Sequence, residues 1–163
     1  MADTDSRTWR SDIAVRADPE HVLDTLTDID ACEAWAPVGF HVDELKSHRL
    51  RTGSTTNVSG RLAGCRVRFR VEIFDADSER LVLRAVGPVE MFASYVVRPS
   101  ARGSQVDAAI SVRRGRGAGA AIAAGATSGL LAAGALDLAL ARIAREAEHR
   151  HHRSPSPSVP VAA

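Results

Sequence analysis

The chain has 163 residues, of which 45% are hydrophobic and 25% charged, with 21 basic against 20 acidic side chains. That length corresponds to about one ordinary domain, which can build a hydrophobic core without disulfides or metals. A net charge of +1 and an aromatic content of 4% argue against a nucleic-acid-binding protein, because such proteins need basic patches or stacking surfaces. Cys32 and Cys65 have no ligand-type spacing, so we expect two buried, reduced thiols.

The first twelve residues contain no apolar segment of the kind that a secretory signal requires, which predicts a cytoplasmic protein. Residues 118–136 are uncharged and approach the length of a bilayer span. Most of them are Ala and Gly, however, and an amphipathic stretch follows directly. We therefore expect a buried helix here and no membrane span.

Alternation of apolar and polar residues predicts seven strands. Short polar turns separate the last six, which is typical of an antiparallel meander. The predicted strands cover residues 8–16, 40–47, 54–62, 65–75, 81–86, 89–98 and 105–113.

Helical patterns interrupt the strands once and follow them at the end. Asp18-Pro19-Glu20 is typical of a helix start, because Asp can cap free amide groups, Pro fits the first turn and Glu favours the helix dipole. Apolar residues follow at helical spacing to Ile29, and a second short helix is predicted over residues 31–35. A long helix is predicted over residues 118–148. The segment 149–163 contains HRHHR and SPSPSVP and predicts a disordered tail, which leaves one domain over residues 7–148.

Two motifs suggest sites that their context argues against. Residues 115–120 fit the GxGxxA form of a dinucleotide fingerprint, but no strand follows the helix that they open. His149, His151 and His152 are close in sequence, as metal ligands are, but in an Arg-rich disordered tail we expect them to be solvated. His21 lies in the first turn of a surface helix and is expected to be structural. We therefore assign no cofactor and no metal site.

Between residues 117 and 135 the predicted long helix carries small side chains on nearly every side. A helix packed on a sheet normally fills the space between them with large apolar side chains. Either the sheet approaches this helix closely, or an apolar void remains that can accept a ligand. By alternation, Tyr95 and Met91 share one face of their strand, and Glu90 lies on the other.

Several segments along the chain resemble one known superfamily. They are Ile13–Ile29 with its ADPEHVLDTLTD run, Glu33–Pro37, Leu50–Gly53 and Glu79–Arg84. Together they are similar to the START/SRPBCC superfamily, and most closely to its polyketide cyclase/dehydrase and lipid transport branch. The resemblance implies an α+β helix-grip fold, with a seven-stranded antiparallel sheet around a long C-terminal helix and two short helices after the first strand. It also implies a ligand cavity between sheet and helix.

Two functions are compatible with this resemblance. The first is a cofactor-independent cyclase or dehydratase acting on a polyketide-like hydrophobic substrate. Tyr95, Glu90 and His41 are its candidate proton-transfer groups, with Arg61 or Arg66 to hold an enolate or carboxylate. The alternative is a non-catalytic carrier or sensor of a hydrophobic small molecule or lipid.

Both functions place the ligand in the same cavity. We expect no nucleic-acid partner, and a monomer or a homodimer. The residues expected to contact the ligand are Trp35, Phe40, Arg61, Phe69, Val71, Met91, Ala126 and Ala133.

Overall fold

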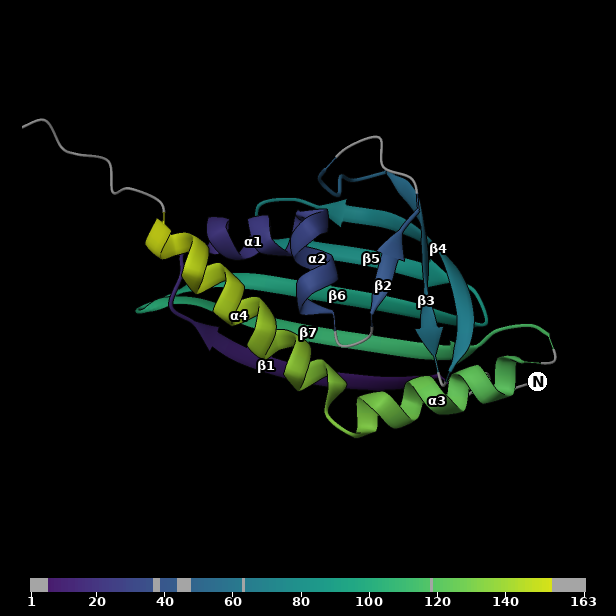
Figure 1. Ribbon diagram of the computed structural model, residues 1–163. Coiled ribbons are helices and arrows are strands. Elements are labelled where there is room, and N and C mark those ends of the chain that lie inside the picture. Colours follow the sequence, from purple (N-terminus) through teal and green to yellow (C-terminus); the bar gives the residue numbers. More distant parts are fainter. Residues whose placement is uncertain (1–5, 37–38, 44–47, 63, 118, 154–163) are drawn as a thin grey trace, which may run out of the picture.

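Figure 1 shows the computed structural model, which describes residues 6–36, 39–43, 48–62, 64–117 and 119–153. A curved antiparallel sheet of seven strands has the order β1-β7-β6-β5-β4-β3-β2, and helices cover its concave face. The predicted fold class is confirmed, and each of the seven predicted strands is present, although the one predicted over residues 40–47 is shorter. The strands are β1 (Arg7–Val15), β2 (Phe40–Val42), β3 (Thr55–Leu62), β4 (Cys65–Ala76), β5 (Arg80–Val86), β6 (Val89–Ser100) and β7 (Gly103–Arg114).

Two short helices follow β1, as predicted. α1 (Pro19–Thr27) begins at its proline, and Asp18 occupies the N-cap position without a side-chain cap hydrogen bond. α2 (Ile29–Trp35) begins two residues earlier than the sequence predicted, because Asp28 caps it by accepting a hydrogen bond from the Asp30 amide at 3.0 Å.

The prediction of one long helix over residues 118–148 is wrong in two respects. The segment forms two helices, α3 (Ala120–Ala132) and α4 (Ala135–Arg153), which meet at a bend of 59°. The break occurs at Gly134, whose φ of +96° is in the left-handed region, and its amide donates to the Leu131 carbonyl at 3.1 Å. The residues 149–153, predicted as the start of a disordered tail, are helical, and the rest of that tail lies outside the described residues.

Within the described ranges, no single helix is both long and apolar enough to cross a membrane. α3 and α4 satisfy the length and composition criteria only when they are taken together across their bend. The expected strand over residues 40–47 ends at Val42, and positions 44–47 lie outside the described residues. Cys65 is exposed, contrary to the expectation, because it stands beside the turn between β3 and β4; Cys32 is buried.

Replacing Gly134 by alanine should lower the free energy of unfolding by about 1–2 kcal/mol, because a Cβ at positive φ is strained. Gly129→Ala is the matched control. Gly129 lies inside α3 with open space around an added Cβ, so alanine there should raise stability by about 0.5–1 kcal/mol. Urea unfolding of both variants checks the pair, and an equal response would contradict the assigned helix break.

The two halves of the helical layer fill the concave face differently. α4 packs Leu140 and Ile143, both almost fully buried, onto the core beside β1 and α1. The buried side chains of α3 are only Ala120, Ala123 and Thr127. Large side chains therefore fill the space between the sheet and α4, whereas the space between the sheet and α3 is incompletely filled. The candidate site lies towards α3 for this reason.

Candidate functional site

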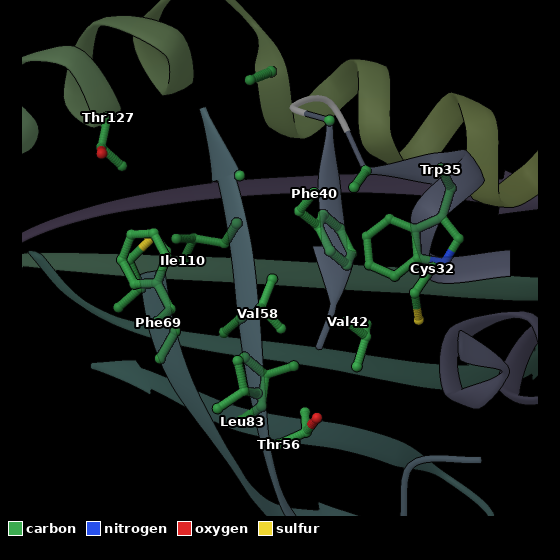
Figure 2. Close-up of a pocket in the computed structure, with 18 of the residues that line it drawn as sticks. Cys32, Trp35, Phe40, Val42, Thr56, Val58, Phe69, Leu83, Ile110 and Thr127 are labelled. Carbon is green, nitrogen blue, oxygen red and sulfur yellow. The ribbon is translucent and has the colours of Figure 1, made fainter. Parts of the chain in front are cut away.

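A cavity of about 300 Å³ lies between the concave face of the sheet, α2 and the junction of α3 with α4. Figure 2 shows side chains from several elements around it, among them Trp35 of α2, Val58 of β3 and Thr127 of α3. Every strand from β2 to β7 contributes to the wall. This volume is at the lower end of the range for small-molecule sites, roughly 300–1,000 Å³.

Most residues expected at the site do line this cavity. The sheet alternates as predicted, so that the inward positions of β4, β5 and β6 carry apolar side chains, while many outward positions carry Arg or Glu. Phe74, Val86 and Phe92 are exposed apolar exceptions on the outward face. The part that the lining residues play in ligand binding stays a prediction. The expected residues that line the cavity are Trp35, Phe40, Arg61, Phe69, Val71, Met91 and Tyr95.

Ala126 and Ala133 are not among the lining residues. Ala126 packs against a separate apolar cluster that includes Val89 and Val112, and Ala133 is exposed at the end of α3. From α3, the cavity wall receives Thr127, Leu130 and Leu131 instead.

Glu90 and His41 lie outside the cavity. Glu90 is on the outward face of β6, where its Oε1 is 2.6 Å from the Arg84 guanidinium. His41 points outward from β2, with 76% of its side chain exposed and Nδ1 3.4 Å from Glu33 Oε1. Neither side chain is placed to exchange a proton with a ligand in the cavity.

Arg61 lies at the edge of the cavity. Its register partner across β3 and β4 is Arg66, and both arginines also line an open polar hollow beside the cavity. On β3, Val58 and Leu62 alternate with Arg61, so its guanidinium belongs to the outward face of the strand. Both guanidinium groups can therefore contact a polar group of a ligand at the rim of the cavity, but not one inside it.

Other lining residues were missed by the sequence reasoning. Val58, Leu83 and Ile110 occupy inward positions of their strands, so the period of two could have found them. Cys32 and Leu50 come from α2 and a connecting segment, and no local pattern in the sequence marks them as neighbours of the sheet.

The polar atoms of several lining side chains are already bonded to the backbone. The Trp35 indole donates to the Thr25 carbonyl at 3.2 Å, and the Cys32 thiol donates to the Leu26 carbonyl at 3.2 Å. The Thr127 hydroxyl donates to the Ala123 carbonyl at 2.8 Å. Burial, together with the charge of Asp28, raises the pKa of the Cys32 thiol to about 12, so the thiolate needed for nucleophilic attack does not form near neutral pH.

Tyr95 differs from these groups. Its side chain is 4% exposed and packs edge-on against Trp35, with ring centroids 5.9 Å apart. No hydrogen bond joins its hydroxyl to any residue that the structure describes, so the backbone-carbonyl partner of an ordinary core tyrosine is absent among them. Burial raises the pKa of the phenol above its ordinary value, so Tyr95 stays neutral and offers a proton donor to the cavity.

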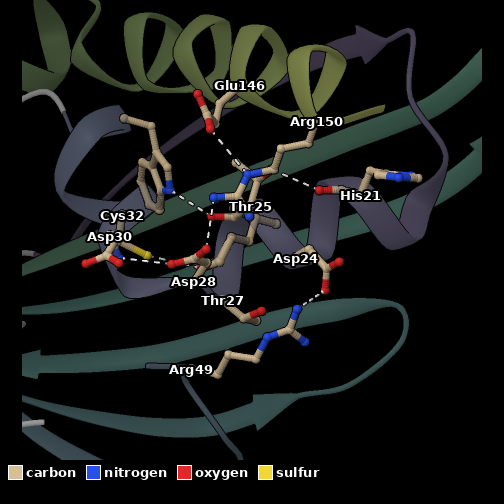
Figure 3. Close-up of polar contacts among 12 residues, drawn as sticks. His21, Asp24, Thr25, Thr27, Asp28, Asp30, Cys32, Arg49, Glu146 and Arg150 are labelled. Carbon is tan, nitrogen blue, oxygen red and sulfur yellow. Dashed lines mark hydrogen bonds and ion pairs between the residues drawn. The ribbon is translucent and has the colours of Figure 1, made fainter. Parts of the chain in front are cut away.

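Ion pairs hold α2 in place at the side of the cavity (Figure 3). The Arg150 guanidinium of α4 is 2.9 Å from Asp28 Oδ2 and 3.2 Å from Glu146 Oε1. Burial raises the pKa of Asp28, but the hydrogen bond and charge of Arg150 and two backbone amides outweigh this, and the pKa is lowered. Asp28 therefore stays ionised, caps α2 and fixes the helix that carries Trp35 and Cys32.

Comparison with known proteins gives a consistent result. A family model described as polyketide cyclase / dehydrase and lipid transport matches residues 7–148. A search of curated proteins gave no match. Among solved structures, the chain is similar to protein CV1439 from Chromobacterium violaceum (TM-score 0.65, 19% identity, covering 87% of this chain and 98% of that one).

Two further structures are similar. One is SA2116 from Staphylococcus aureus (TM-score 0.68, 9% identity, covering 94% of this chain and 100% of that one). The other is DynU16, a protein of the dynemicin biosynthetic locus (TM-score 0.58, 22% identity, covering 88% of this chain and 48% of that one). The chain thus spans about half of DynU16, and at these identities the likeness shows the fold alone. The family model covers nearly the whole described domain, and the chain belongs to the polyketide cyclase/dehydrase and lipid transport family of the START/SRPBCC superfamily.

Proposed function

We propose that the protein is a carrier or sensor that binds one hydrophobic small molecule in the cavity between sheet and helices. The observation that carries this proposal is the chemistry of the wall. Among the described residues that line it there is no carboxylate and no imidazole, and the bonded indole, thiol and Thr127 hydroxyl are turned to the backbone. Such a wall favours binding through burial of apolar surface.

The expected affinity follows from that burial. Each buried methylene group contributes about 0.8 kcal/mol, so a ligand with ten buried carbons gains roughly 8 kcal/mol before the cost of its immobilisation. The Tyr95 hydroxyl supplies one directional contact and would favour a ligand that presents a carbonyl or hydroxyl oxygen to it.

A second candidate function is the cofactor-independent cyclase or dehydratase, and Tyr95 is the observation that favours it. A neutral phenol can donate a proton to a carbonyl oxygen as enolate charge develops. Such a reaction also needs a group that removes a proton. Glu90 and His41 do not line the cavity, which is why binding without turnover is proposed first.

Titration with 1-anilinonaphthalene-8-sulfonate, followed by displacement with 2-ethylnaphthalene, tests the binding proposal. We expect one site per chain and full displacement. Absence of saturable binding, or several weak sites per chain, would contradict it. Incubation with a poly-β-ketone and analysis by mass spectrometry separates the second candidate, because ring closure above the protein-free rate would show turnover.

A further inference from the structure

Three side chains of metal-binding type converge where α1 begins and α4 ends. They are Asp18, His21 and His151, and one ligand atom from each lies within 4.8 Å of the others. None of the three lines the apolar cavity, so the cluster is separate from the proposed ligand site. Sequence reasoning missed it because His151 was assigned to a disordered tail and grouped with His149 and His152.

Two side-chain contacts hold the turn of α4 that leads into His151. The Arg16 amide, directly after β1, donates to Glu148 Oε1 of α4 at 3.0 Å and so links the helix to the end of that strand. On the other side of the helix turn, Arg150 is 2.9 Å from Asp28 Oδ2. Figure 1 shows the last turns of α4 beside α1, and Figure 3 shows Arg150 crossing from α4 towards α2, with His21 close by on α1. The cluster therefore rests on two packed helices, as a preorganised site requires.

The side chains are oriented towards one another. The rings of His21 and His151 meet edge-on, with centroids 5.0 Å apart. The Nδ1 atom of His151 is buried, makes no hydrogen bond within the described ranges, and is 3.8 Å from Asp18 Oδ2, which exceeds hydrogen-bond length. The Asp18 carboxylate does not cap α1 although it stands at the N-cap position. Its position beside His151 is consistent with a role as a ligand.

We propose that Asp18, His21 and His151 bind a zinc ion. Two imidazole nitrogens and one carboxylate oxygen are a donor set that Zn²⁺ accepts, with water as the fourth ligand. Ligand atoms around tetrahedral zinc are roughly 3.3 Å apart, so these side chains need to move inward by about 1.5 Å at most. The ion would join the first turn of α1 to the last turn of α4 and stabilise the folded chain.

The test is binding of Co²⁺ and Zn²⁺ by the full chain. We expect Co²⁺ to produce the visible absorption of a tetrahedral site, and Zn²⁺ to displace it and raise the melting temperature. His21→Ala and His151→Ala should each weaken Zn²⁺ binding at least about tenfold in calorimetry. His149→Ala is the matched control, since His149 lies exposed on the same turn of α4 and should leave the affinity unchanged.

His21→Ala is the decisive variant. His21 lies on α1, far in sequence from His149, His151 and His152, so it takes no part in metal binding by the end of α4 alone. Binding that survives His21→Ala but is lost when His149, His151 and His152 are all replaced would show adventitious coordination by the helix end and overturn the proposal. Absence of Co²⁺ absorption in the parent protein would also overturn it. Asp18→Asn, which keeps the shape of the side chain, should weaken binding without altering circular dichroism.

Discussion

Replacing Ala93 by phenylalanine should weaken binding of 1-anilinonaphthalene-8-sulfonate at least about tenfold, which corresponds to about 1.4 kcal/mol. Ala93 is 7% exposed and lies in the middle of β6, between Leu83 of β5 and Ile110 of β7, with which it pairs. All three residues line the cavity. A phenyl ring at this position enters the space that a ligand needs and so competes with it directly.

The control for this prediction is Ala133→Phe. The same ring is added at an exposed position that does not line the cavity, so probe binding should stay at the parental level. Equal affinity in the two variants would contradict the position of the site. Because overpacking costs about 1–3 kcal/mol where space is lacking, a cooperative thermal transition must be recorded for Ala93→Phe. Ala93→Val provides a smaller step, with a smaller loss of affinity expected.

Replacing Tyr95 by phenylalanine should weaken binding of 2-acetylnaphthalene by about three- to tenfold, the effect of one hydrogen bond. Binding of 2-ethylnaphthalene, which has the same shape without the carbonyl oxygen, should not change. Displacement of the fluorescent probe measures both affinities in the parent and in the variant. Equal losses for the two ligands would show that the hydroxyl donates to neither of them.

The same variant distinguishes a ligand-binding tyrosine from a structural one. No hydrogen bond to the Tyr95 hydroxyl occurs within the described part of the chain, so Tyr95→Phe removes none. The free energy of unfolding should stay constant or rise by up to about 1 kcal/mol, because an unbonded polar group is costly to bury. A loss of about 1 kcal/mol would instead indicate a core tyrosine whose hydroxyl stabilises the fold.

The sequence by itself determined the architecture. A period of two in strands such as 65–75 and 89–98 specifies which side chains face inward, because successive residues of a strand point to opposite faces. The same period predicts from the sequence alone that Tyr95 and Glu90 lie on opposite faces of their strand. The Asp18-Pro19-Glu20 helix start and the short polar turns between strands are also local features. These features depend on neighbours along the chain, and local patterns therefore predict them.

Only the tertiary structure decided where the site lies and what reaches it. The bend of 59° between α3 and α4 and the absence of Ala126 and Ala133 from the cavity wall were not predicted from the helical pattern of residues 118–148. Cys32 contributes to the wall because α2 packs into the core, and Arg150, far away in the chain, pairs with Asp28 at the start of that helix. His151 likewise meets His21, from which it is 130 positions distant in the chain, because α4 packs on α1 and continues as a helix into a segment whose composition favours disorder. Packing against a distant element outweighs the weak conformational preference of such a segment. The residues within the segment therefore do not predict that it is helical.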